Sequence, residues 1–295
     1  MAPTIAVAGA TGNLGMRLVR ALRERGAEVV ALVRTATDGR KITELERLGG
    51  KAVEVDLATA SDVAEAMEGA TCVVSVLAGL HDVIVERQKV LLEAAILAAI
   101  PKFIPSDFST DFTALTPGEN RNFDLRREFH QTLDVAPIAS TAIFNGAFAE
   151  ILTYNVPLLD FKEKVVGYWE NPDWHIDFTT MDNTAAFTAA AALDPDTPKS
   201  LRIASFQVSP NDLVAYTAKT FGTPYKLVRL GSLEDLRAYN KRERAAHPEG
   251  ENELYAKWQQ SQYMQSMFST HHETLDNDRY PGFVWSELED VIEPR

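Results

Sequence analysis

The stretch that decides the fold of this 295-residue chain is TIAVAGATGNLGMRLVRAL, residues 4–22. A short apolar run passes directly into three glycines, Gly9, Gly12 and Gly15, and a helical pattern follows at once. Glycine permits positive φ angles and close backbone approach. A tight turn between a strand and a helix can therefore aim free N–H groups at an anion. The stretch is either the phosphate-binding turn of a nucleotide site or a plain connection between two elements.

The alternation of strand and helix continues to about residue 145. Short β-branched runs predict strands at 4–8, 28–33, 52–55, 72–77, 102–105 and 140–144. Helical patterns lie between them, near residues 13–25, 42–48, 61–68, 83–99 and 120–134. Repeated strand–helix–strand units predict right-handed crossovers and a parallel sheet, and strands that are apolar throughout indicate helices on both faces. The predicted fold class is α/β, a doubly wound parallel sheet of the Rossmann type.

The regular alternation fades after Asn145, where proline, glycine and aromatic residues become frequent. We predict that residues 1–155 form a nucleotide-binding domain. Residues 156–295 are predicted to form a smaller C-terminal cap or substrate region, interleaved with the first. The strand-like segment 201–209 is expected to return to the sheet.

The composition limits the classes of partner. A net charge of −13 argues against broad contact with nucleic acid or anionic lipid. The single cysteine, Cys72, excludes an intrachain disulfide and fits a reducing compartment. No signal-peptide pattern is seen at the start, and the apolar run 90–100 is too short to span a bilayer. We therefore expect a cytoplasmic monomer or homodimer with a small-molecule substrate. No metal is expected, because no cluster has ligand spacing.

The context of the glycines favours a dinucleotide over a plain turn. Strand, glycine turn and helix together present N–H groups and a helix dipole to a pyrophosphate. Chains that prefer NAD usually place a carboxylate about twenty residues further on, against the ribose 2′-hydroxyl. Arg34 occupies that place here and Lys41 follows, which suits the 2′-phosphate of NADP; the alternative is a surface arginine. Asp56, after the third predicted strand, either binds the adenine amino group or caps the next helix.

Polar residues also follow the fifth predicted strand. Ser106 and Asp107 lie at the carboxyl edge, where ligands of open α/β sheets bind. They either contact the nicotinamide or substrate, or they form a turn. Arg126 and His130 are four residues apart and share one face of the helix predicted at 120–134. His130 either reaches the same space as Arg126 or is an ordinary core or surface histidine.

Four motifs, VAGATGNLG, ALVR, KFIPSDFSTDF and IASTAIFNGAF, resemble the NmrA-like and isoflavone-reductase-like branch of the atypical short-chain dehydrogenases. The resemblance covers about residues 3–190 and implies an NADPH-binding domain, with a small C-terminal region completing the substrate cleft. The cofactor-binding residues that it implies are Gly9, Thr11, Gly12, Asn13, Leu14 and Gly15 in the glycine loop, Arg34 at the 2′-phosphate, and the nicotinamide-side walls Leu77–Ala78, Pro105–Ser106 and Phe144–Asn145–Gly146.

Two catalytic patterns of related enzymes are absent. None of the tyrosines has a lysine four residues later, so the usual Tyr-x-x-x-Lys pair for proton transfer is missing. The isoflavone-reductase-like enzymes use a lysine in a helix, and the resemblance places Arg126 at that position. Arginine stays protonated and is a poor acid or base, although it can orient a substrate or polarise a carbonyl. Arg126 and Ser106 are the two candidate catalytic residues.

Two functions fit these observations. The first is an NADPH-dependent oxidoreductase that transfers a hydride to a small planar acceptor such as a quinone, an enone or an aromatic carbonyl. A quinone needs no strong protein acid, since its reduced product takes protons from water. The alternative is a non-catalytic, NADP(H)-sensing regulator of the NmrA type that binds a protein partner.

Overall fold

The computed structural model describes residues 2–292, and their contacts divide them into two compact units. Unit 1 consists of the chain up to Phe108, Leu125–Ile143 and Met181–Leu201. Unit 2 consists of Ser109–Asp124, Phe144–Thr180 and the chain from Arg202 onward. Segments of the two units therefore alternate along the sequence.

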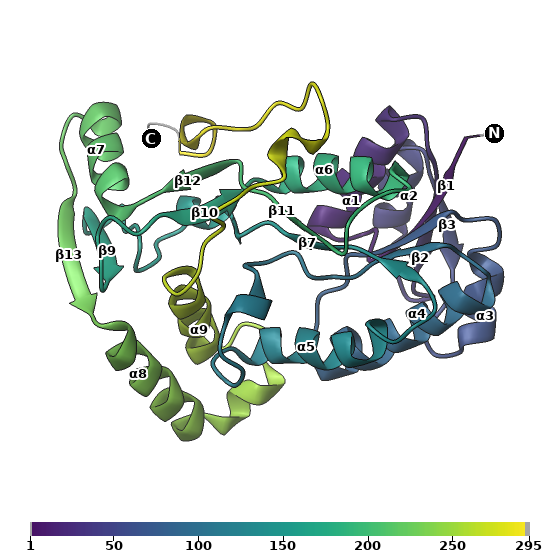
Figure 1. Cartoon of the computed structure of the whole chain (residues 1–295), viewed down its shortest axis with the longest axis horizontal. Helices are drawn as coiled ribbons and strands as arrows, with labels where there is room; N and C mark the ends of the chain where they lie inside the picture. The colour runs from purple at the N-terminus through teal and green to yellow at the C-terminus, as the bar shows by residue number, and fades with distance from the viewer. Residues whose placement is uncertain (1, 293–295) are drawn as a thin grey trace. The chain divides into compact units, whose positions relative to one another are not determined.

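Unit 1 is built on a six-stranded sheet whose order is β3-β2-β1-β4-β5-β6. Figure 1 labels β1, β2 and β3 of this sheet. Every neighbouring pair of strands is parallel. The strands are β1 (Thr4–Ala8), β2 (Glu28–Val33), β3 (Gly50–Glu54), β4 (Cys72–Ser75), β5 (Lys102–Ile104) and β6 (Ala139–Ser140). This order is that of a doubly wound dinucleotide-binding sheet, so the predicted fold class is confirmed. The order reverses between β1 and β4, and ligands of open α/β sheets bind at such a reversal, outside the carboxyl ends of the strands.

Helices cover the sheet because successive strand residues point to opposite faces. Ala6, Ala8 and Phe103 belong to a buried cluster with α3, α4 and the part of α5 that lies in unit 1. Ile5 and Val7 alternate with them and are fully buried on the other side, and α1 packs closely against α6. The helices are α1 (Asn13–Glu24), α2 (Gly39–Arg47), α3 (Ala60–Ala66), a π-helical segment (Asp82–Arg87) continued by α4 (Gln88–Leu97), α5 (Arg121–Leu133) and α6 (Met181–Leu193).

The segment 201–209, expected in the main sheet, pairs elsewhere. It contributes to β11 (Ser200–Arg202), which pairs with β7 (Ala142–Phe144). It also forms β12 (Phe206–Val208), which pairs antiparallel with β10 (Ile176–Thr179). Neither strand belongs to the six-stranded sheet. The alternating pattern of this segment identifies extended structure, but its pairing partners are far away in sequence.

Unit 2 has its own core and its own strands. β8 (Ala147–Phe148), β10 and β12 form a three-stranded sheet, and β9 (Val165–Trp169) pairs with β13 (Lys226–Gly231). Three helices follow, α7 (Pro210–Phe221), α8 (Leu233–Ala246) and α9 (Lys257–Met267). The first two begin with capping boxes at Ser209 and Ser232. The buried cluster of this unit includes Leu158, Val166 and Phe178.

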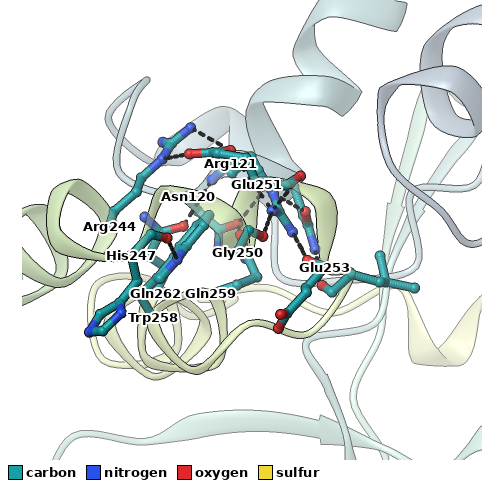
Figure 2. A network of polar contacts seen from close by, with 12 residues as sticks. Asn120, Arg121, Arg244, His247, Gly250, Glu251, Glu253, Trp258, Gln259 and Gln262 are labelled. Atoms are coloured by element: carbon teal, nitrogen blue, oxygen red, sulfur yellow. Dashed lines mark hydrogen bonds and ion pairs between the residues drawn. The ribbon is translucent and has the colours of Figure 1, made fainter.

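A buried arginine organises an irregular part of unit 2, as Figure 2 shows. The Arg121 guanidinium donates hydrogen bonds to the carbonyl oxygens of Gly250 at 2.8 Å and Glu253 at 2.9 Å. It also lies 4.8 Å from the centre of the Trp258 ring, and the main-chain N–H of Arg121 donates to Gln262 Oε1 at 3.0 Å. Guanidinium offers five N–H donors in a fixed plane. One side chain therefore binds several carbonyl oxygens of one irregular segment, including that of Gly250, which also accepts from the N–H of Glu253.

Within residues 2–292, none of the helices is both long enough and apolar enough to cross a membrane.

Candidate functional site

The glycine turn after β1 has geometry that only glycine fits. Gly9 has a φ of +87°, and a Cβ atom there would lie 2.6 Å from the carbonyl oxygen of Val76, just beyond β4. A Cβ at Gly15 would overlap the carbonyl oxygen of Gly9 and the backbone of Ala10. Gly12 has more room, since its nearest neighbour is the Gly9 oxygen at 3.3 Å. Gly9 and Gly15 therefore allow the turn to pack directly against the main chain.

The first turn of α1 follows this packing and is exposed at Gly12 and Asn13. Gly12 is the N-cap and supplies no side-chain acceptor. The first N–H groups of a helix have no partner within the helix, and the helix dipole makes this end attractive to anions. The turn thus has the two features that a pyrophosphate site requires.

The residues expected around the rest of the nucleotide lie on the surface of unit 1. Arg34 directly follows β2 and is exposed, as are Lys41 in α2 and Asp56 after β3. Within residues 2–292 no hydrogen bond or ion pair of the Arg34 guanidinium is found. Arg40 differs, because its guanidinium is paired with Asp38 at 2.8 Å. Arg34 is therefore available to a ligand, whereas Arg40 is already engaged.

Ser106 connects three neighbouring elements at the carboxyl edge. Its hydroxyl donates to the carbonyl oxygen of Leu77 at 2.6 Å, and its N–H donates to Gln88 Oε1 at 2.9 Å. Its own carbonyl oxygen accepts from Arg126 Nε at 3.0 Å. Gln88 is held in turn by donating to the carbonyl oxygen of Ile84 at 2.8 Å. The structure thus brings Leu77, Ser106 and Arg126 together. The Ser106 hydroxyl is already engaged as the hydrogen-bond donor to the Leu77 carbonyl.

His130 and Asp107 form a partly buried ion pair next to this group. His130 Nε2 lies 2.6 Å from Asp107 Oδ2, the Asp107 side chain is fully buried and the imidazole is 19% exposed. Burial lowers the pKa of His130, but the charge of Asp107 and its hydrogen bond outweigh burial and raise that pKa above its usual value. His130 is thus paired with Asp107. The sequence left open whether His130 reaches the space near Arg126 or is an ordinary core or surface histidine, and this partly buried pair fits neither alternative completely.

The third predicted wall, Phe144–Gly146, belongs to unit 2. Asn145 is fully buried, its N–H donates to the carbonyl oxygen of Ser109 at 3.0 Å, and its carbonyl oxygen accepts from Thr179 Oγ1 at 2.6 Å. Gly146 has a φ of +62°, and a Cβ there would overlap the backbone of Asp177. The main chain of this wall is therefore rigid, and glycine is required at its end.

Sequence reasoning missed Gln88, which fixes the N–H of Ser106. A signal was present, because Gln88 is four residues after Ile84 and lies among buried residues of the same helical segment. A polar residue on an otherwise apolar face usually has a specific hydrogen-bond partner.

Sequence spacing also gave no sign of a second group, His81, Glu86 and Glu128, whose potential ligand atoms lie within 4.8 Å of one another. These side chains are between 42% and 57% exposed, and His81 Nε2 is 2.9 Å from Glu128 Oε1. Their contacts with one another are those of a surface ion-pair cluster.

Comparison with known proteins agrees with this geometry. The model of the NmrA-like family matches residues 1–267. Pinoresinol reductase 1 of Arabidopsis thaliana is 31% identical over 213 residues, which are 65% of this chain and 65% of the relative. The chain thus matches just under two thirds of that relative's length.

Two solved structures share the fold. A structure of AtPrR2 with NADP⁺ and (+)pinoresinol has a TM-score of 0.79 and 21% identity, and the match covers 98% of this chain and 97% of the other. A crystal structure of isoflavone reductase has a TM-score of 0.80 and 19% identity, and 99% of each chain is covered.

Gly15→Ala is expected to lower the free energy of unfolding by about 1–3 kcal/mol, because the new methyl group overlaps the Gly9 carbonyl. Gly12→Ala is the matched control. It should lower the free energy of unfolding by clearly less, since its methyl group meets only one atom, at 3.3 Å. Urea titration of both variants measures the difference. Equal losses would contradict the packing described for this turn.

Replacing His130 by Gln is expected to destabilise the protein by about 1–3 kcal/mol below pH 6.5, where the wild-type imidazolium is charged against Asp107. Because the pKa of His130 is raised in the folded state, this stabilisation is complete below the unfolded pKa. It is lost as the pH rises through the folded pKa.

The wild type and His130→Gln should therefore converge at alkaline pH in unfolding experiments run across this range. His175→Gln, at a side chain that is 52% exposed, should change the free energy of unfolding by much less at every pH. A constant gap at all pH values would mean that the charge of His130 is not involved.

Proposed function

The chain belongs to the NmrA-like family, and we propose that it is an NADP(H)-dependent oxidoreductase that transfers a hydride to a small planar acceptor. The observation that carries this proposal is the glycine turn at the carboxyl edge of the 3-2-1-4-5-6 sheet, where a Cβ at Gly9 or Gly15 would meet main-chain atoms. Such a cradle lets backbone N–H groups approach a pyrophosphate.

The choice of NADP(H) over NAD(H) rests on Arg34. This residue is exposed at the end of β2, at the place where a carboxylate would bind a ribose 2′-hydroxyl. A guanidinium there forms charge-assisted hydrogen bonds with a 2′-phosphate, and Lys41 supplies a second cation. The fold neighbour AtPrR2, whose structure contains NADP⁺, supports the same cofactor. Asp56 would then lie on the adenine side.

The remaining cofactor contacts are proposed from the family pattern. Leu77–Ala78 and Pro105–Ser106 would form the nicotinamide wall of unit 1. The same family pattern also assigns Phe144–Gly146 to the cofactor. The hydrogen bond from Ser106 to the Leu77 carbonyl holds the first two segments together. In this proposal Ser106 keeps the wall in place and the cofactor supplies the hydride when bound.

Arg126 determines the kind of acceptor that we propose. Its guanidinium donates to the carbonyl oxygen of Ser106 and remains charged at any pH relevant to the protein. A fixed positive charge stabilises negative charge that develops on an acceptor oxygen, but it provides no proton. Quinones suit a site without a proton donor best, because their reduced products take protons from water. Enones and aromatic carbonyls are the next candidates for the acceptor. The name of the Arabidopsis relative, pinoresinol reductase 1, supports a reductase.

One observation favours a second candidate, a non-catalytic NADP(H) sensor that binds a protein partner. The Arg126 guanidinium, which donates to the Ser106 carbonyl, and the Ser106 hydroxyl, which donates to Leu77, do not offer a proton to an acceptor. A sensor needs the cofactor site but no proton donor. It should associate with its partner in a nucleotide-dependent manner without turning over any acceptor.

Arg34→Ala is expected to weaken NADPH binding by about tenfold to a hundredfold, the loss of a charge-assisted hydrogen bond, and to leave NADH binding nearly unchanged. Isothermal titration calorimetry measures both dissociation constants. Arg40→Ala is the matched control, because Arg40 is close in sequence but paired with Asp38. If NADPH and NADH lose affinity equally in Arg34→Ala, Arg34 does not bind the 2′-phosphate.

The purified protein with NADPH is expected to reduce at least one of benzoquinone, cyclohexenone and benzaldehyde, followed as loss of nicotinamide absorbance. Arg126→Met should lower kcat while the dissociation constant of NADPH stays the same, because Arg126 is proposed to act on the acceptor. Tight NADPH binding without turnover of any acceptor would reject the oxidoreductase and favour the sensor.

A further inference from the structure

The helix that follows β4 changes its winding partway along. Its first part, Asp82–Arg87, is π-helical, and α4 continues from Gln88. In an α-helix each N–H bonds to the carbonyl four residues earlier, whereas in a π-helix the acceptor lies five residues earlier. The N–H of Gln88 donates to the carbonyl oxygens of Val83 and Val85. The carbonyl of Ile84, which would be the α-helical acceptor of that N–H, is therefore passed over.

The side chain of Gln88 binds the carbonyl that its own N–H passes over. Gln88 Nε2 donates to the Ile84 carbonyl oxygen at 2.8 Å. Both residues are buried, Gln88 completely and Ile84 with 1% exposed, so a carbonyl without a partner would cost free energy here. A glutamine amide offers donors on its nitrogen and acceptor sites on its oxygen. Because the nitrogen is bound to Ile84, the orientation of the oxygen is set as well.

The oxygen of the same amide group holds the main chain of Ser106. Gln88 Oε1 accepts from the N–H of Ser106 at 2.9 Å, and Ser106 is only 4% exposed. Ser106 is the middle residue of a three-residue turn just beyond β5, in which the N–H of Asp107 donates to the carbonyl oxygen of Pro105 at 2.9 Å. Gln88 therefore connects the π-helical segment to the middle of this turn.

Two other elements hold Ser106 through its remaining polar groups. The Ser106 hydroxyl donates to the carbonyl oxygen of Leu77 at 2.6 Å, and the Ser106 carbonyl oxygen accepts from Arg126 Nε at 3.0 Å. Gln88 is the partner of the N–H. Without it the turn would lose one of its three side-chain contacts, and the contacts with Leu77 and Arg126 would no longer be fixed from that side.

The two halves of the proposed nucleotide site lie on different strands of the sheet. The glycine turn follows β1 and Arg34 follows β2, whereas Ser106 follows β5, and β4 lies between β1 and β5. A change at Gln88 therefore acts on the nicotinamide side and leaves the residues proposed for the 2′-phosphate and pyrophosphate in place. This separation makes a positioning role distinguishable from a general contribution to stability.

We propose that Gln88 is a positioning residue for the nicotinamide half of NADP(H). The π-helical segment directs its amide group onto Ser106, and this bond keeps the wall formed by Leu77–Ala78 and Pro105–Ser106 in its binding conformation. The inference rests on the proposed function, which assigns the nicotinamide to that wall. Gln88 takes no part in hydride transfer. Its effect is on affinity, because a wall that is ordered before binding loses no further conformational freedom when the nicotinamide binds.

The test compares NADP⁺ with adenosine 2′,5′-bisphosphate, which carries the adenine, the ribose and the 2′-phosphate but no nicotinamide. Isothermal titration calorimetry measures both dissociation constants for the wild type and for Gln88→Met, whose side chain has a similar length and lacks the amide group. The variant should bind NADP⁺ about tenfold more weakly, the effect of one hydrogen bond, and the bisphosphate as tightly as the wild type does. Gln131→Met, at an exposed position of α5, is the matched control and should change neither constant.

Three outcomes would overturn the inference. Equal losses of affinity for both ligands in Gln88→Met would show a general loss of structure, and unchanged affinity for both would show that the bond to Ser106 does not set the wall. A wild type that binds neither nucleotide would reject the proposed function and the inference together. That outcome is distinct from the other two, because it appears without any variant.

A measurement on the wild type covers the case in which Gln88→Met does not fold. The NMR signals of the Gln88 side-chain NH₂ group and of the Ser106 N–H should shift when NADP⁺ is added and stay in place when the bisphosphate is added. The Ser106 N–H should also exchange slowly with solvent before any nucleotide is present, because its partner lies within the protein. Equal shifts with both ligands, or rapid exchange of this N–H, would contradict the role of Gln88.

Discussion

The end of β1 packs directly against the main chain that follows β4, and the carboxyl edge of unit 1 depends on this contact. At Gly9 a side chain would meet the Val76 carbonyl, and at Gly15 it would meet Gly9 itself. Because the main chain is close-packed here, it cannot relax around the methyl group that an alanine would add. The turn is therefore fixed at the point where the strand order reverses, and Gly12 and Asn13 at the start of α1 remain exposed.

A continuous set of hydrogen bonds extends this rigid edge to the next strand. Ser106 joins the end of β5 to Leu77 beyond β4, to Gln88 at the start of α4, and to Arg126 of α5. Each of these bonds satisfies a group that would otherwise be buried without a partner. The result is a wall whose polar groups are occupied by one another. Such a wall can position a flat cofactor and acceptor, but it has few groups left for proton transfer.

Unit 2 shows the opposite arrangement at residues 271–276. Their main chain is held by hydrogen bonds at His272 and Asp276, yet His271 and His272 each retain a buried nitrogen without a hydrogen-bond partner among the described residues. Saturated polar groups hold a structure in place, whereas unsatisfied buried ones cost free energy.

The sequence by itself determined the parallel sheet, the approximate positions of its first five strands and the glycine turn, because these depend on local periodicity and on the backbone freedom of glycine. The sixth strand was predicted at 140–144, but the main sheet contains Ala139–Ser140, and Ala142–Phe144 pairs with β11. It also indicated Arg34, whose proposed role follows from its distance along the chain from the glycines. Only the tertiary structure decided that Ser106 bonds to Leu77 and Gln88, that His130 pairs with Asp107, and that 201–209 leaves the main sheet. These contacts join residues that are far apart in sequence, and no local pattern contains that information.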